Sequence, residues 1–161
     1  MTQTQIENKV LVEKYPFLLP RNRWTGESVA DYDYSFTELD DMPIGWRKAF
    51  GEQMCEELLA EVPYMKSPGQ YRILQIKEKY GILRWYDSGG TERTDRIIER
   101  YAVRSARTCI SCGAPATEVS VNWVSPYCDA CAHARELRYE SFIPIDIWYS
   151  KHESDEKGEK L

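Results

Sequence analysis

The most regular hydrophobic pattern in the chain lies between residues 41 and 62. Large apolar side chains recur there every four residues, which is the spacing of one face of a helix. Asp41 can cap such a helix, and Pro43 in its first turn lacks an amide that would have no partner there anyway. We therefore predict a helix over residues 41–62 that buries one stripe, with Cys55 beside it as a core thiol. The stripe consists of Trp46, Phe50, Met54 and Leu58.

A second pattern, rich in β-branched and aromatic residues, covers residues 70–87 and predicts two strands joined by a turn at Gly81. Gly89 and Gly90 then interrupt the chain. A basic, amphipathic stretch over residues 91–107 predicts a helix. Together these elements predict an α+β fold in which a small antiparallel hairpin packs with helices.

The other segments show weaker patterns. Residues 3–15 predict a short helix that ends before Pro16, and residues 16–36 predict an ordered loop packed by its aromatic side chains. The charged residues 150–161 predict a flexible tail. We expect the α+β domain to span residues 1–107.

Four cysteines form two C-x₂-C pairs separated by fifteen residues, a spacing that is typical of a tetrahedral metal site. Gly113, directly after the first pair, suits the turn that brings both sulfurs to one ion. The second pair is followed by Ala132 and other helix-forming residues, which places it at a helix N-terminus, where the helix dipole favours thiolates. Four sulfur ligands leave no open coordination position, so we predict one structural zinc ion. Its ligands would be Cys109, Cys112, Cys128 and Cys131.

The run TCISCGAPAT…WVSPYCDACAHARELR, residues 108–138, resembles treble-clef zinc fingers, in which a knuckle and strands precede a helix that carries the second ligand pair. We expect a strand over residues 118–124 and a final strand or packed tail over residues 142–149, so that the module spans residues 108–149. Iron in place of zinc, His133 as a substitute ligand, a redox-active pair and four unrelated thiols remain as alternatives.

Composition narrows the class of protein. Hydrophobic residues make up 42% and charged residues 29% of the 161-residue chain, which is typical of a globular protein. No stretch is long and apolar enough to span a membrane, and the first residues lack the basic and then apolar pattern of a signal peptide. We therefore expect a cytoplasmic protein, in which paired cysteines bind metal more often than they form disulfides.

The net charge of −5 argues against non-specific nucleic-acid binding, but the charge is unevenly distributed. Basic residues outnumber acidic ones in residues 66–107, whereas both flanking segments are acidic. Arginines recur along one face of the predicted helix 91–107 at spacings of three and four. Like charges so placed destabilise a helix, which favours an anionic partner. A solvated face with local ion pairs and neutralisation by the chain's own acidic segments are the alternatives. The arginines are Arg93, Arg96, Arg100, Arg104 and Arg107.

The predicted hairpin adds three cations, Lys77, Lys79 and Arg84, among aromatic residues. Such interleaving can bind a partner or stack nucleic-acid bases. The alternative is that long basic side chains cover the sheet with their aliphatic stems.

The run KEKYGILRWY at residues 77–86, followed by a basic helix and two cysteine pairs, resembles small uncharacterised bacteriophage and prophage proteins that combine a KEK(F/Y)GxLR(F/W)Y segment with a cysteine finger. The run YPFLLPRNRWTGE at residues 15–27 is part of the likeness. The resemblance implies a phage–host context, with the protein in the cytoplasm of the host bacterium. It implies no particular chemistry.

The residues favour binding over catalysis. The chain contains no Ser/His/Asp grouping, no phosphate-binding glycine loop and no nucleophilic cysteine outside the pairs. We therefore expect a non-enzymatic protein that binds a host protein or complex through its basic surface, because Tyr, Trp and Arg are favoured interface anchors. Nucleic-acid binding is the alternative, and a small phage enzyme is less favoured.

Overall fold

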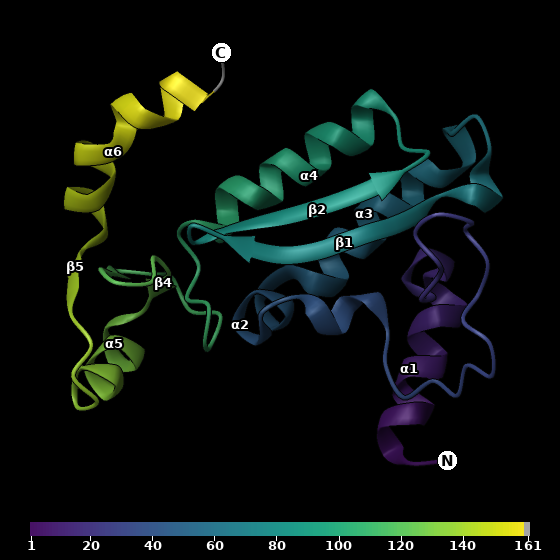
Figure 1. Ribbon diagram of the computed structural model, residues 1–161, viewed down its shortest axis with the longest axis horizontal. Coiled ribbons are helices and arrows are strands. Elements are labelled where there is room, and N and C mark those ends of the chain that lie inside the picture. The colour runs from purple at the N-terminus through teal and green to yellow at the C-terminus, as the bar shows by residue number, and fades with distance from the viewer. Residues whose placement is uncertain (160–161) are drawn as a thin grey trace.

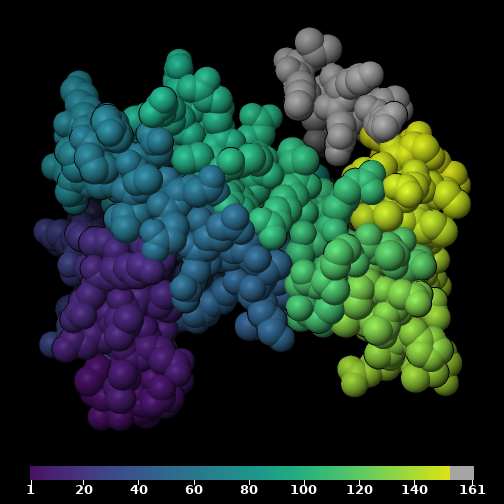
Figure 2. Space-filling model, turned by 180° about the vertical axis from the view of Figure 1, so that it is seen from behind, coloured from purple at the N-terminus to yellow at the C-terminus, as the bar shows by residue number. Residues whose placement is uncertain are grey.

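The computed structural model describes the backbone of residues 1–159 and the side chains of residues 1–152. It shows the α+β fold expected from the sequence, with helices packed on a two-stranded antiparallel sheet and a smaller cysteine-bearing module with its own three-stranded sheet. Helix α1 (Gln3–Lys14) lies at one end of the molecule and the cysteine module at the other (Figure 1). Figure 2 shows the same division from behind. No helix within residues 1–159 is long and apolar enough to cross a membrane.

Strands β1 (Arg72–Lys79) and β2 (Ile82–Ser88) pair antiparallel within the range expected for the hairpin. Tyr80 and Gly81 form the turn, and both have positive φ, 54° and 78°, as a two-residue type I′ turn requires. The register shifts at Leu74, which has no partner on β2 and forms a bulge.

The bulge decides which side chains face the core. Ile73 and Ile76 are three positions apart and both are buried, because the extra residue between them restores the alternation of the strand. Leu83 and Trp85 of β2 are buried on the same face of the sheet. The hairpin therefore has one apolar face against the helices and one face that points away from them.

The apolar stripe over residues 41–62 is buried as expected, but the segment is not one continuous α-helix. Short α2 (Ile44–Trp46) leads through a π turn at Arg47–Gly51 into α3 (Glu52–Glu61). Side chains four positions apart drift by about 40° per step around an ideal α-helix. A wider π turn opposes that drift, which keeps the whole stripe in the core.

The start of this segment also differs from the expectation. The helix begins at Ile44 rather than at Asp41. The N–H of Thr37 donates to the Asp40 carboxylate at 2.7 Å, and Glu38–Asp41 form a separate 3₁₀ turn. Asp41 therefore ends that turn instead of capping the helix.

Helix α4 (Glu92–Ser105) begins at Thr91, whose side chain accepts the N–H of Thr94, and lies along β2 and against α3 (Figure 1). At its far end the Ser105 hydroxyl accepts the N–H of Leu83 at 2.8 Å, which ties the helix to β2. The core therefore sits between the hairpin and helices α3 and α4. Its largest fully buried side chains include Trp46, Tyr15, Phe50, Leu18, Leu39, Met54, Leu58 and Leu83.

The cysteine module contains a three-stranded antiparallel sheet in the order β4-β3-β5. Its elements are β3 (Glu118–Ser120), β4 (Pro126–Tyr127), α5 (Asp129–Glu136), β5 (Phe142–Pro144) and α6 (Ile145–Glu159). Antiparallel strands followed by a short helix is the order expected for a treble-clef-like finger.

Three boundaries in this module differ from expectation. The strand expected over residues 118–124 ends at Ser120, whose hydroxyl accepts the N–H of Ser125 at 3.0 Å and closes a turn. Of residues 142–149, only Phe142–Pro144 form a strand, because helix α6 begins at Ile145. The backbone is helical as far as Glu159. Residues 160 and 161 lie outside the described residues, so the flexibility of residues 150–161 stays a prediction, as does the domain boundary at residue 107.

Candidate metal centre

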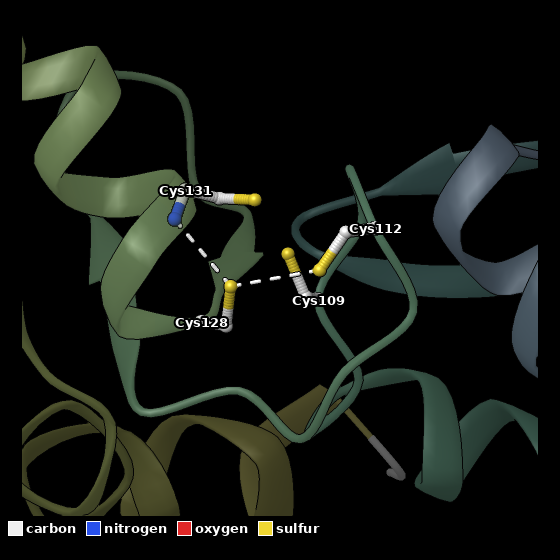
Figure 3. Close-up of side chains that lie close together, drawn as sticks. All are labelled: Cys109, Cys112, Cys128 and Cys131. Carbon is white, nitrogen blue, oxygen red and sulfur yellow. Dashed lines mark hydrogen bonds between the residues drawn. The ribbon is translucent and has the colours of Figure 1, made fainter.

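The four cysteines singled out by their spacing come together in space. Their sulfur atoms all lie within 4.8 Å of one another, with 3.6 Å between Cys112 Sγ and Cys128 Sγ. Figure 3 shows the two pairs facing each other, one from a loop and one from the start of a helix. Four sulfurs around a tetrahedral ion at about 2.3 Å are separated by about 3.8 Å. The cluster therefore has the dimensions needed to hold one metal ion. Its members are Cys109, Cys112, Cys128 and Cys131.

The first pair lies on a tight knuckle. The N–H of Gly113 donates to the Cys109 carbonyl at 3.0 Å, and the N–H of Cys109 donates to the Ala114 carbonyl at 2.7 Å. Gly113 has φ of 86°, in the left-handed region that favours glycine. The turn expected after the first pair is therefore present, and it aims the sulfurs of Cys109 and Cys112 to the same side.

The second pair lies at the start of α5, as the absence of a glycine after Cys131 predicted. Cys128 is the N-cap residue, and its sulfur accepts the N–H of Cys131 at 3.4 Å. A helix N-terminus carries partial positive charge and stabilises thiolate. His133, the alternative ligand, is not a member of the cluster; it lies on the helix surface, 3.9 Å from the carboxylate of Glu136.

The pKa values of the cysteine thiols indicate that the four sulfurs need a nearby cation to be ionised together. Burial alone would raise the pKa of Cys109, but the N–H groups of Cys128, Cys112 and Ser111 donate to its sulfur and lower the pKa to about 7. For Cys131, burial and hydrogen bonds with the other sulfurs raise the pKa to about 12. Crowded sulfurs cannot all ionise at neutral pH without a positive charge among them. A bound metal ion would supply that charge, so the donor set fits a metal.

Helix α2 is joined to the knuckle by two hydrogen bonds. The N–H of Gly45 donates to the Ile110 carbonyl at 2.9 Å, and the indole N–H of Trp46 donates to the Thr108 carbonyl at 2.9 Å. A Cβ atom on Gly45 would lie 2.3 Å from the Cys109 carbonyl oxygen. The two backbones therefore touch directly beside the cluster, and only glycine permits this contact.

A second contact joins the module to the tip of the hairpin. Glu78 uses both carboxylate oxygens there: one accepts the N–H of Gly81 at 2.6 Å, and the other accepts the indole N–H of Trp123 at 3.3 Å. Gly81 itself faces the backbone of Val124 and Ser125. The hairpin and the cysteine module are thereby fixed relative to each other.

The structure separates the eight predicted partner-binding cations into two groups. Four of the five arginines expected on the basic helix have partners within the chain, and Arg107 lies two residues beyond the end of α4. Arg100 contacts the carboxylate of Glu57 at 2.5 Å, and Arg93 approaches Glu61 at 3.7 Å. Arg104 donates to Gln53 at 3.0 Å, and Arg107 contacts Asp146 at 3.0 Å. Within the described side chains only Arg96 of this set has neither an ion pair nor a hydrogen bond.

These contacts show that α3 and α4 run antiparallel. Gln53, Glu57 and Glu61 repeat every four residues along α3, opposite Arg104, Arg100 and Arg93. Neutralisation by the chain's own acids, one of the alternatives open at the sequence level, therefore accounts for much of the arginine face. Glu57 and Glu61, one helical turn apart, were the signal in the sequence that could have indicated it.

The hairpin cations are placed differently. Lys77 and Arg84 are directly opposite each other on adjacent strands, on the face turned away from the core. Lys79 lies on the same face, two residues further along β1. Within residues 1–152 none of the three makes an ion pair; Lys77 and Lys79 instead lie near the rings of Tyr86 and Tyr80, at 5.9 and 5.7 Å from the ring centroids. We call Lys77, Lys79 and Arg84 the basic sheet face.

The cysteine cluster can hold one metal ion through four sulfur donors and, so filled, has no position left for a substrate or water. Comparisons with protein-family models, with curated proteins and with solved structures found no match. The likeness to phage proteins stays a prediction.

Proposed function

We propose that this protein is a binding protein that recognises an acidic surface of a partner protein through the basic sheet face, and that a structural zinc ion in the cysteine cluster holds the surface in place. The observation that supports this most directly is the contrast between the two sets of cations. Three of the five arginines form ion pairs within the chain, with Glu61, Glu57 and Asp146, whereas none of the three cations of the basic sheet face forms an ion pair among the described side chains.

The direct pairing of Lys77 with Arg84 strengthens the argument. Like charges directly opposite each other on neighbouring strands destabilise a sheet. An anionic group bound between them would remove that repulsion and gain a favourable interaction with both. The free protein therefore carries an unfavourable arrangement that a partner of opposite charge relieves.

The zinc ion has a supporting role in this proposal. It closes the knuckle, the knuckle contacts α2 through Gly45, and Trp123 of the same module contacts Glu78 on β1. The metal would thereby stabilise the contact of the module with α2 and its contact with the hairpin. The likeness to phage proteins makes a host protein in the bacterial cytoplasm the expected partner.

Nucleic-acid binding is a second candidate, favoured by one observation. Tyr80 at the hairpin tip is 68% exposed, and Tyr86 is also exposed, each beside a lysine of the basic sheet face. Exposed aromatic rings next to cations can stack bases while the cations contact phosphates. The overall negative charge of the chain, −5, makes this the weaker candidate.

Neutralising the basic sheet face is expected to weaken partner binding. For the triple variant Lys77→Gln, Lys79→Gln and Arg84→Gln, we expect the Kd for the partner isolated from lysate to rise about tenfold or more, because three charge contacts are lost together. The measurement is titration calorimetry at low and at physiological salt. A fluorescent single-stranded oligonucleotide serves as the probe for the second candidate.

A variant with the same loss of charge elsewhere provides the control. Lys48, Lys66 and Lys151 are exposed and make no ion pair among the described side chains, so Lys48→Gln, Lys66→Gln and Lys151→Gln together should leave the Kd unchanged. Equal affinity of both triple variants would refute the basic sheet face as the binding surface. Tight binding of the oligonucleotide, with a steep loss as salt increases, would favour nucleic acid over protein.

A further inference from the structure

The side chain of Trp24 lies almost entirely in solvent. It is 91% exposed, more than any of the other four tryptophans. Trp123 is 75% exposed but donates its indole N–H to Glu78. Trp46 and Trp85 are buried, and Trp148 stacks on His152. Trp24 is thus the only tryptophan whose ring is neither buried nor engaged in a ring contact or hydrogen bond within residues 1–152.

A single exposed apolar side chain is common on protein surfaces, but the turn that presents Trp24 is held by several hydrogen bonds. The side-chain oxygen of Asn22 accepts the N–H groups of Trp24 and Thr25 at 2.8 and 3.0 Å. The backbone of Asn22 exchanges hydrogen bonds with Gly26 and Glu27, both at 2.8 Å. Arg21 and Ser28 close the base as an isolated β-bridge.

Contacts from the hairpin hold this turn in place. Arg72, the first residue of β1, donates to the Arg23 carbonyl at 3.3 Å. Gly26 has φ of 76°, and a Cβ there would lie 2.4 Å from the Arg72 guanidinium. A left-handed glycine, a half-buried arginine and an Asx turn therefore fix the direction of the Trp24 side chain, which itself has no ring contact or hydrogen bond within residues 1–152. None of these hydrogen bonds involves the Trp24 ring, so they order the turn without holding the ring against the rest of the chain.

We propose that Trp24 is a preformed anchor that inserts into an apolar pocket on the surface of a partner protein. This rests on the proposed binding function and adds a second contact site, at the end of β1 opposite the hairpin tip. Trp is the residue most enriched among those that dominate binding energy at protein interfaces. A rigid turn lowers the entropy lost when that side chain is immobilised, which is the advantage of a preorganised loop.

The surroundings favour a protein pocket over the other surfaces that bind tryptophan. Membrane-surface binding requires an amphipathic element with several apolar side chains and many cations. The tip of this turn presents a single ring, that of Trp24, with a cation, Arg23, directly before it and an anion, Glu27, three residues after it. A single flat apolar ring with mixed charges at its rim matches one deep apolar pocket with a polar rim, the usual plan of a protein interface.

The test uses a photo-crosslinking amino acid in place of Arg23, whose side chain is exposed next to Trp24, and as a control in place of Lys48. Irradiation in a lysate of the source cells should give one protein adduct at position 23 that is absent at position 48. That protein is then purified, and its affinity for the full-length chain and its variants is measured. We expect Trp24→Ala to weaken binding about 30-fold or more, the loss typical of a dominant interface residue.

Two further variants separate anchoring from a folding defect. Gly26→Ala leaves Trp24 intact but strains the turn, so it should also weaken binding while the melting temperature of the main domain changes little. Tyr139→Ala removes an aromatic ring that is 97% exposed in the cysteine module and should keep full affinity.

The anchor would be refuted if no adduct is specific to position 23, or if Trp24→Ala binds with the same affinity as the unaltered chain. It would also be refuted by a blue shift of Trp24 fluorescence with phosphatidylcholine–phosphatidylglycerol vesicles, because that result would assign the ring to a membrane surface. If Trp24→Ala binds normally while neutralising the basic sheet face abolishes binding, only the anchor is lost. The opposite result would retain the anchor and refute the basic sheet face.

Discussion

Removal of metal from the cysteine cluster is expected to unfold at least residues 108–137 and to loosen the contact with α2. The apolar cluster around the cysteine sulfurs is small and includes Tyr127, Ala132 and Phe142. Structural zinc contributes on the order of 10–16 kcal/mol in modules of this kind. The remaining apolar contacts are too few to replace it. A chelator should therefore abolish the ordered signals of the module in an NMR spectrum and lower the melting temperature of the whole chain.

Substitutions at the cysteines should distinguish ligands from other thiols. Cys112→Ser is expected to lower the metal content of the purified protein from about one ion per chain to near zero, because a hydroxyl is a poor ligand for this site. Cys55→Ala is the matched control: its thiol is buried in the main core, where desolvation raises its pKa to about 12, and it is not part of the cluster. Metal content by mass spectrometry should be unchanged in this variant. The identity of the ion, zinc or iron, follows from the same measurement.

Metal affinity should fall as the pH is lowered. Metal binding displaces protons from sulfurs, and in the metal-free cluster Cys131 has a pKa raised to about 12, while the pKa of Cys109 is about 7. Because protons compete with the metal for the thiolates, lower pH weakens the apparent affinity and higher pH strengthens it. A chain that binds no metal at any pH, and whose melt is unaffected by chelator, would refute the metal centre.

Gly45→Ala is expected to destabilise the protein and to weaken metal binding at the same time. The new Cβ would lie 2.3 Å from the Cys109 carbonyl oxygen and 2.5 Å from the carbonyl of Ile110. Both neighbours are backbone atoms, so the overlap can be relieved only by moving the knuckle away from α2. Overpacking of a buried site costs about 1–3 kcal/mol, and loss of the Gly45 hydrogen bond to Ile110 adds to this. The free energy of unfolding by denaturant and the metal affinity are the two measurements.

Gly69→Ala is the matched control for this prediction. No atom lies within 4 Å of the Cβ position at Gly69, so the same chemical change should alter the stability by less than about 1 kcal/mol. If Gly45→Ala is as stable as Gly69→Ala and binds metal equally well, the close contact between α2 and the knuckle does not support the metal site.

Local patterns predicted the elements with regular spacing well. The stripe from Trp46 to Leu58 is buried, the hairpin turns at Gly81, and Cys128 begins a helix. Each depends on residues close together in the chain: a period of four, a glycine at a tight turn, or ligands followed by helix-forming residues. Boundaries were less accurate, because α2 begins only at Ile44, after the Glu38–Asp41 turn.

The function of the basic residues could not be predicted in this way. The arginines of α4 formed the more conspicuous pattern in the sequence, but Glu57 and Glu61 of α3 neutralise two of them. Lys77 and Arg84 are less regularly spaced in the sequence, yet they lie directly opposite each other on adjacent strands and form no ion pair among the described side chains. Whether a charged side chain forms an ion pair depends on which segment packs next to it. Arg100 and Glu57 are 43 positions apart, so the local sequence around either residue does not indicate that they are in contact.

The sequence alone therefore determined the secondary structure around its strongest periodicities and the identity of the four candidate metal ligands, because both follow from spacing along the chain. The packing of α3 against α4, the backbone contact at Gly45 and the exposure of Trp24 were decided only by the tertiary structure. These features arise from contacts between distant segments, whose relative position depends on how the whole core packs.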